Sequence, residues 1–447
     1  MKYPLKAGGD GHYLVDQNEA PVFLVGDSPQ TAFALLNRSE WAAYLVDRQS
    51  RGVNIVWVGA LCDLYLSING KGSAGCNSSM RTYDGIAPFT SGNSQTTYDI
   101  STPNKAYWSR VDSYIKMAAS HGITVLLDVW DNGGLTPLSE ASGNTRMYDF
   151  GVFLGNRYKS FPNIIWMVGN DFQNWNKNAK DNILIKNLMA GIASVDKSHL
   201  RTTELDFNRS KSIDDSLLAP YTTLDGVYDY YCTYAEVYEA YNAGIPAFLE
   251  EGYYENGTSA NAGNAMGNTV TAEILRRQGW WTVLAGAPGQ IYGNMNIWPL
   301  STDWRSNLNS PGITQFGYLA SFVKGIDWYR LVPDQSHTIV TAGYGTEDTG
   351  EGNRACIVDN AYVVTAYFRD GSGSVSYAPV STTLTVAMSR FTGPVNATWF
   401  DPTAGRYSMI SGSPFSNSGT KDFATPGENG AGDRDWVLLI HLASSGT

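Results

Sequence analysis

The sequence is poor in charged residues and in the residues that usually bind metals. Only 16% of its 447 residues are Asp, Glu, Lys or Arg, and its formal net charge is −11. Nucleic-acid binding requires clustered Lys and Arg to contact phosphates, and the sequence contains no such cluster. Its four cysteines and five histidines form no metal-ligand spacing, so no metal site and no cofactor are expected. Cys62 and Cys76 either close a loop as a disulfide or remain buried thiols.

Long apolar segments are also missing. No run of 18 apolar residues occurs, so we expect no helix that spans a membrane. Residues 1–6 lack the apolar core of a signal peptide. Either the protein is cytoplasmic, or the sequence begins after a removed signal and the protein is secreted or periplasmic. Nothing in the sequence indicates an oligomeric state.

Strand and helix signals alternate along the first 330 residues. Eight strand–helix units fit a (β/α)8 TIM barrel. A doubly wound open sheet fits less well, because the first turn lacks a GxGxxG motif and the units continue past six. The predicted strands lie at 21–25, 54–61, 124–130, 164–171, 201–206, 226–231, 246–251 and 290–293. The predicted helices lie at about 37–52, 107–121, 146–160, 179–195, 235–242, 271–284 and 312–324.

The pattern changes after Pro333. Short alternating segments separated by Gly- and Ser-rich turns predict a small antiparallel β-sandwich. The sequence therefore indicates two domains, a barrel over 1–333 and a sandwich over 334–447. The segments that predict sandwich strands are 338–340, 361–367, 383–386, 397–400 and 435–440.

Two of the predicted barrel strands end in carboxylates, Asp171 and Glu251. Side chains at the carboxyl ends of barrel strands share one pocket, and two carboxyl groups flanking a sugar bond are what glycoside hydrolysis requires. Each acid could instead cap a helix or form a salt bridge. Glu250 competes with Glu251, because neighbours on a strand face opposite sides and alternation does not decide which one faces the pocket.

Aromatic residues are abundant, with 27 Tyr and 13 Trp. Aromatic rings stack well on sugars, although they also fill large cores. Trp130, Tyr253 and Trp298 are candidates for walls of a sugar site or for rim packing. Asp27 ends the first strand, in the layer of the two acids, and is expected to contact sugar hydroxyls unless it caps a helix.

The ordered motifs resemble those of the family called domain of unknown function 4038, which includes the apiosidases of glycoside hydrolase family 140. The tail, with 399–405 and 435–439, resembles the collagen-binding domain that usually follows, although we read no collagen binding from that name. The segments that carry the main resemblance are 21–28, 37–61, 104–130, 163–171, 251–255, 290–298 and 327–334.

The resemblance implies a retaining glycosidase on a (β/α)8 barrel. The family's acid/base Asp maps onto Asp171 and its nucleophile Glu onto Glu251, and the match favours Glu251 over Glu250. The family usually has Gly-Gly-Asp where this chain has Gly169-Asn170-Asp171. The Asn170 amide could bond a sugar 2-hydroxyl, as in many related barrel glycosidases. Residues 228–234 also depart from the family's polar motif.

The implied substrate is a plant or microbial glycan, with apiose or another pentofuranose removed from its end. Alternatives are a glycosidase acting on hexoses or inside a chain, and a non-catalytic carbohydrate-binding or adhesion protein on a barrel scaffold. A barrel aldolase would need a Schiff-base lysine at a strand end, and the predicted strands contain none.

Overall fold

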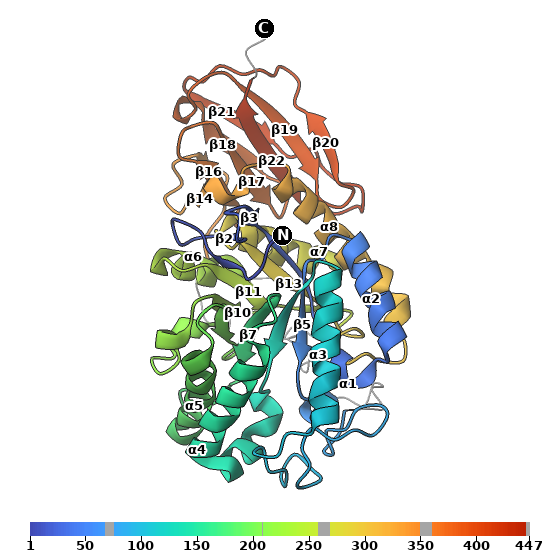
Figure 1. The fold of residues 1–447 in the computed structure, drawn as a ribbon. Helices are drawn as coiled ribbons and strands as arrows, with labels where there is room; N and C mark the ends of the chain where they lie inside the picture. The colour runs from blue at the N-terminus through green and yellow to red at the C-terminus, as the bar shows by residue number, and fades with distance from the viewer. Residues whose placement is uncertain (68–75, 208, 258–268, 349–359, 444–447) are drawn as a thin grey trace.

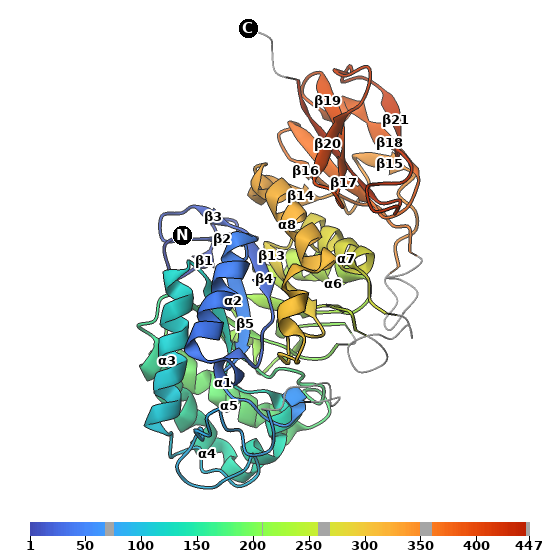
Figure 2. The same cartoon turned by 90° about the vertical axis from the view of Figure 1, so that its right-hand side faces the viewer.

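The computed structural model describes residues 1–67, 76–207, 209–257, 269–348 and 360–443. These residues form a barrel of strands and helices with a smaller all-β domain stacked on one end (Figure 1). The view from the side shows the β-domain resting against α7 (Ala272–Leu284) and α8 (Pro311–Lys324) (Figure 2). Part of the long loop after the second barrel strand, residues 68–75, lies outside the described residues, and so does Cys356.

The barrel contains, within the described part of the chain, eight parallel strands. Their order around the sheet is β8-β7-β6-β5-β4-β13-β11-β10, so neighbours in the sheet are neighbours along the chain. This confirms the predicted TIM barrel. The strands are β4 (Leu24–Asp27), β5 (Ile55–Gly59), β6 (Thr124–Asp128), β7 (Ile164–Val168), β8 (Arg201–Thr203), β10 (Asp225–Tyr228), β11 (Ala247–Glu251) and β13 (Gly289–Asn294).

A serine side chain joins β8 to β10, where strand pairing is incomplete. Ser212 lies at the start of a short 3-10 turn after β9 (Ser210–Lys211), which pairs antiparallel with β10. Its hydroxyl accepts the N–H groups of Thr203 (3.1 Å) and Gly226 (3.0 Å) and donates to the Thr203 carbonyl (2.5 Å). One hydroxyl thus replaces part of the missing ladder.

Helices surround the barrel and begin at side-chain caps. Asn37 and Glu40 form a capping box at the start of α2, and Asn104, Asp131 and Asn178 cap the next three long helices. Helix α4 starts at Asn132 rather than at the predicted position near 146, because two helical segments join across Gly143. Besides α7 and α8, the helices around the barrel are α1 (Ala32–Leu35), α2 (Arg38–Ser50), α3 (Lys105–Ser120), α4 (Asn132–Tyr158), α5 (Ala179–Val195) and α6 (Thr233–Ala243).

The barrel interior is apolar at the end where its strands begin. A three-stranded sheet, β1 (Lys6–Ala7), β2 (Leu14–Val15) and β3 (Pro21–Val22), places its apolar side chains in the same cluster and closes that end. Polar groups are therefore concentrated at the opposite, carboxyl end of the strands. The interior cluster includes Leu24, Ile55, Trp57, Leu126, Ile165, Met167, Phe248 and Ile291.

The C-terminal domain is a two-layered antiparallel sandwich, as predicted. The strands over 331–333, 373–378, 406–409 and 420–424 were not predicted, and the one over 406–409 has no buried residue that would mark it as a strand in the sequence. The larger sheet has the order β14 (Leu331–Pro333), β16 (Val364–Phe368), β17 (Gly373–Ala378), β22 (Trp436–Leu442), β19 (Val395–Asp401) and β20 (Arg406–Met409). The smaller sheet contains β15 (Val340–Ala342), β18 (Thr383–Ala387) and β21 (Thr420–Ala424).

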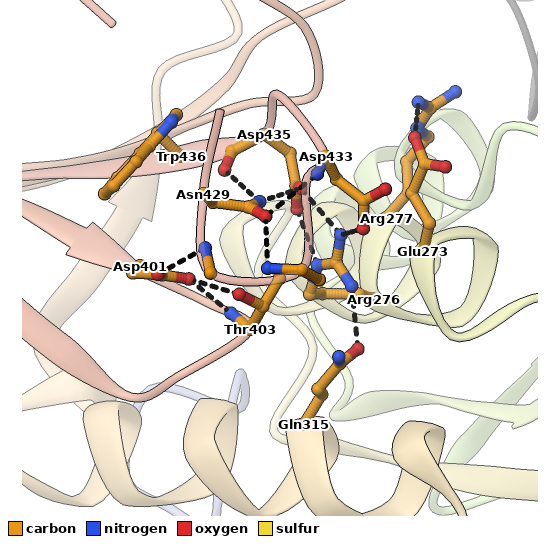
Figure 3. Close-up of polar contacts among 12 residues, drawn as sticks. Glu273, Arg276, Arg277, Gln315, Asp401, Thr403, Asn429, Asp433, Asp435 and Trp436 are labelled. Atoms are coloured by element: carbon orange, nitrogen blue, oxygen red, sulfur yellow. Dashed lines mark hydrogen bonds and ion pairs between the residues drawn. The ribbon is translucent and has the colours of Figure 1, made fainter. Parts of the chain in front are cut away.

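A buried arginine connects the two domains. Arg276 on α7 is only 4% exposed and reaches into a loop of the sandwich (Figure 3). Its guanidinium donates to Asp435 (2.6 and 2.7 Å) and to Asp433 (2.8 Å). Trp280, its neighbour on α7, stacks on Tyr377 of β17 at 6.0 Å. The helix that follows β11 is thus fixed to the second domain.

Candidate active site

Two carboxylates meet at the carboxyl end of the barrel. Asp171 follows β7, and Glu251 is the last residue of β11. The Tyr228 hydroxyl, at the end of β10, lies 3.0 Å from Asp171 Oδ1 and 3.0 Å from Glu251 Oε1. The two carboxylate oxygens are therefore no more than twice 3.0 Å apart.

The environment of Glu251 is buried and rich in tyrosine. Glu251 is 7% exposed, and both Tyr228 and Tyr230 donate hydrogen bonds to its Oε1. Burial, followed by the negative charge of Asp171, raises the pKa of Glu251 to about 8, against the opposing effect of the tyrosine hydroxyls. The Tyr230 ring is itself stacked on Tyr253, with centroids 5.3 Å apart.

A bulge in β11 separates Glu250 from Glu251. Val227 pairs with Leu249 and Tyr228 pairs with Glu251, so Glu250 is an extra residue between them. The Glu250 carboxyl accepts a hydrogen bond from Thr202 inside the barrel and is fully buried. The bulge interrupts the strict alternation that left open which of the two glutamates faces the pocket. Glu251 is the one that shares a partner with Asp171.

Asp171 is half-buried and held by several groups. Tyr65 donates to its Oδ2 at 2.6 Å, and Gln173 donates to its Oδ1 at 3.2 Å. Its backbone N–H donates to Glu204 Oε2 at 2.9 Å. The backbone of Asp171 is in the left-handed region, with a φ of 51°. Tyr65, Gln173 and Tyr228 thus fix the carboxylate, and Glu204 holds the backbone.

Further carboxyl groups lie buried beside the pair. Burial raises the pKa of Asp63 to about 6 and that of Asp128 to about 7. Burial and neighbouring carboxylates raise the pKa of Asp131 and of Glu204 well above the ordinary range.

No group of three or more side chains suited to hold a metal ion occurs in the described ranges. We also find, among these residues, no helix with the length and apolarity needed to cross a bilayer.

Two of the expected sugar contacts are not available in the structure. Asp27 is fully buried, and its carboxylate accepts hydrogen bonds from Arg48, Tyr44 and the backbone of Ser28. It therefore anchors α2 to the barrel instead of facing a ligand. Trp130 is also fully buried, with its ring against Phe150. Its position after β6 turns the indole into the core between strand and helix.

The other three candidates lie close to the pair or at its rim. Asn170 is 3% exposed, and its amide donates to Asp128 at 3.3 Å. Tyr253 is 1% exposed and supports Tyr230 from behind. Trp298 is half-buried, and its ring lies 6.2 Å from that of Tyr254. Trp298 is the predicted aromatic with the greatest exposure.

Cys62 and Cys76 form a disulfide, which resolves the two alternatives that the sequence left open. Their Cα atoms are 5.2 Å apart, and Trp298 packs against the small cluster that contains them. Cys232 is also disulfide-bonded, and its partner lies outside the described residues. The bridge between Cys62 and Cys76 closes the segment that carries Tyr65.

The residues that sequence reasoning missed are mainly the tyrosines and Glu204. Tyr228 and Tyr230 were noted only as a departure from a family motif, although two tyrosines spaced by one residue after a barrel strand can both reach a shared pocket. Glu204 lies inside the predicted strand 201–206, and only the structure, which ends β8 at Thr203, places it at a strand end as Glu251 is. Tyr65 follows Cys62 by three residues in a long loop, where no local pattern indicates its direction.

A comparison with models of protein families identifies the family of this chain. The model of the apiosidase-like catalytic domain matches residues 9–330. The chain belongs to this apiosidase-like family. A second model, of the collagen-binding domain of a collagenase, matches residues 356–441. A comparison with curated proteins gives no match.

Solved structures share the architecture of this apiosidase-like protein over its full length. A structure described as a glycoside hydrolase has a TM-score of 0.79 at 22% identity and covers 100% of this chain and 98% of its own. A glycoside hydrolase family 5 protein from Bacteroides vulgatus has a TM-score of 0.77 at 23% identity, with 99% and 93% covered. At these identities the likeness shows a common two-domain fold.

Proposed function

We propose that the protein is a retaining glycoside hydrolase in which Glu251 is the nucleophile and Asp171 the acid/base. The observation that carries the proposal is the Tyr228 hydroxyl, which contacts both carboxylates at 3.0 Å. In retaining enzymes the two carboxyl groups lie about 5–5.5 Å apart, whereas inverting enzymes need roughly 6.5–9.5 Å to admit a water. The upper limit set by Tyr228 supports the retaining geometry.

The proposed mechanism requires one proton on the two carboxyl groups, because one acts as an anion and the other as an acid. Glu251 attacks the anomeric carbon as a carboxylate, and two tyrosine hydroxyls donate to it and favour that charged form. Asp171 then carries the proton and gives it to the leaving oxygen, and later accepts one from the attacking water. Because the raised pKa of Glu251 arises in part from the charge on Asp171, a proton on Asp171 lowers the pKa of Glu251.

We infer a substrate that is a neutral sugar at the end of a plant or microbial glycan, with apiose or another pentofuranose as the first choice. The family match supports this class. Asn170 and the half-buried Trp298 are proposed to contact the sugar, with Tyr253 behind Tyr230 as support. Among the described residues, the hydrogen-bond partners of the two carboxylates are tyrosine hydroxyls and a glutamine amide, and no Lys or Arg side chain pairs with either. The site therefore offers no positive side chain beside the pair that would favour a charged sugar.

The disulfide suggests where this hydrolase works. Cys62 and Cys76 are bridged next to the site, and such bonds persist in oxidising compartments. We therefore propose a secreted or periplasmic location, which suits an enzyme that degrades external glycans.

The test is turnover of aryl glycosides and sugar release from pectin and arabinan. We expect Glu251→Gln to have no detectable turnover, because the amide cannot attack the anomeric carbon. Asp171→Asn should lose about 10²–10⁴-fold in kcat on natural glycans and much less on substrates with good leaving groups, which need no proton.

Glu250→Gln is the matched control, since Glu250 is the adjacent buried glutamate and points to Thr202. It should keep turnover. Loss of activity in Glu250→Gln together with retention in Glu251→Gln would reverse the assignment. Proton NMR of the first product gives the stereochemistry, and an inverted anomer would exclude the retaining mechanism.

A further inference from the structure

Glu204 is a buried acid beside the pair that the proposed mechanism does not use. It follows β8, is fully buried and makes one contact with the site. Its Oε2 accepts the backbone N–H of Asp171 at 2.9 Å. Its Oε1 is buried and has no hydrogen-bond partner among the described residues. A buried polar atom in this state calls for an explanation.

The partner of Glu204 has an uncommon backbone. Asp171 has a φ of 51°, a region that residues other than glycine adopt rarely. Gly169, two residues earlier, has a φ of 81°, and a side chain there would approach Thr203 Cγ2 to 3.2 Å. The turn after β7 therefore lies directly on the end of β8. The bond from Asp171 N–H to Glu204 ties the strained residue to that neighbouring strand.

The surroundings of Glu204 disfavour a charge on it. The largest effects of neighbouring charges on it come from Glu251, Asp171 and Glu250, all acids. A negative charge on Glu204 would also raise the pKa of the Tyr228 and Tyr254 hydroxyls. Together with burial, these acids raise the pKa of Glu204 well above its ordinary range. A neutral carboxyl still accepts a hydrogen bond through its carbonyl oxygen, so the contact with Asp171 does not need the charge.

We propose that Glu204 is a positioning residue: its carboxyl holds Asp171 by its backbone N–H in the left-handed conformation that aims the Asp171 carboxyl at Tyr228 and Glu251. This inference rests on the proposed function for its kinetic consequences. Its structural content, the dependence of the Asp171 backbone on Glu204, stands without it.

The test compares Glu204→Gln with Glu204→Met. The Gln side chain keeps an acceptor oxygen and is always neutral, so kcat, KM and both limbs of the pH profile should stay close to wild type. The Met side chain has a similar length and no acceptor. Because a displacement of about 1 Å of a catalytic group can cost 10²-fold, we expect kcat to fall by about that factor with little change in KM.

Asp225 provides the matched control. It is also fully buried and accepts one backbone N–H, from Ile213 at 3.1 Å, and its second oxygen has no hydrogen-bond partner in the described part of the chain. It lies at the opposite end of β10 from the site. Asp225→Asn and Asp225→Leu should leave kcat unchanged in the folded protein, whatever they do to the melting temperature.

Several outcomes would overturn the proposal. Full kcat in Glu204→Met would show that Asp171 does not need the contact. A loss in Glu204→Gln equal to that in Glu204→Met, or a shift of its pH limbs to lower pH, would show that Glu204 acts as a charge. If Glu204→Met does not fold, a lowered kcat or a shifted pH profile in Glu204→Gln would still overturn the proposal.

Failure of the proposed function would be distinguishable. Wild-type protein that releases no sugar from any glycoside would refute the glycosidase assignment. The positioning role is then judged by the crystal structure of Glu204→Met. We expect residue 171 to leave the left-handed region in that structure, and an unchanged φ at Asp171 would overturn the inference.

Discussion

At the residue scale, the hydroxyl of Tyr228 lies between the two carboxylates of the proposed catalytic pair. It can donate to Asp171 or to Glu251 at any moment, and both lie 3.0 Å away. The Tyr230 hydroxyl lies 2.9 Å from it and donates to Glu251 as well. Such a hydrogen-bonded chain lets the site change which carboxyl is charged without moving the backbone.

The pH dependence of activity follows from the pair. Because the pKa of Glu251 is raised to about 8, the pair keeps one proton up to that pH and loses it above. We expect kcat/KM to fall above about pH 8, when no proton remains for the leaving group. It should also fall at acidic pH, when both carboxyls are protonated and the nucleophile is neutral.

Tyr228→Phe should lower kcat and move the alkaline limb to higher pH. The phenol donates to Glu251, and this bond lowers the pKa of that carboxyl, so its removal raises the pKa further. Tyr148→Phe is a suitable control, because Tyr148 is 39% exposed on α4. An alkaline limb that moves to lower pH in Tyr228→Phe would contradict this account.

At the element scale, the barrel depends on Ser212 between β8 and β10, where strand pairing is incomplete. Ser212→Ala removes the acceptor for the N–H groups of Thr203 and Gly226 between β8 and β10. A buried donor left without a partner costs roughly 1–3 kcal/mol, so we expect a loss of at least that size in the free energy of unfolding. Urea denaturation measures it.

Ser120→Ala is the control for this substitution. The Ser120 hydroxyl is exposed and, among the described residues, bonds only to Met117 within its own helix. This change should leave the denaturation midpoint nearly unchanged. Equal midpoints for Ser212→Ala and wild type would show that water or a shifted strand replaces the serine.

At the scale of the whole molecule, the buried Arg276 links helix α7 of the barrel to Asp433 and Asp435 of the sandwich. Arg276→Met would leave the buried Asp435 without its charged partner, although Tyr377 and Asn429 still donate to it. Breaking a buried ion pair in this way costs about 3–5 kcal/mol. We expect a large drop in melting temperature by calorimetry, with both domains unfolding in one transition.

Arg330→Met tests whether burial is the cause. Arg330 pairs with Asp370 of the sandwich at the surface. Exposed ion pairs contribute little, so this variant should melt close to wild type. If Arg276→Met instead melts in two steps, with the barrel transition unchanged, the sandwich is an appended module rather than a support for α7.

Stability of the whole molecule should fall as pH rises from about 4 to 8. Burial raises the pKa of Asp128, Asp225 and Asp229 to about 7, well above the unfolded value near 4. In that range the folded state binds more protons than the unfolded one, so the stabilisation present at low pH is lost through the folded pKa values. Melting temperatures measured at pH 5 and pH 8 test the sign, and Asp225→Asn should reduce the difference.

The sequence by itself determined the strand–helix alternation, the change to a sandwich and the two strand-end acids. These are local properties, because apolar runs, caps and turn residues act within one element. Only the tertiary structure decided which side chains meet. The bulge at Glu250, the burial of Asp27 against Arg48, and the contacts of Tyr65, Tyr228 and Glu204 with Asp171 all arise between segments distant in sequence. Packing across the barrel, which no local pattern encodes, turned two predicted acids into a pair that shares the Tyr228 hydroxyl.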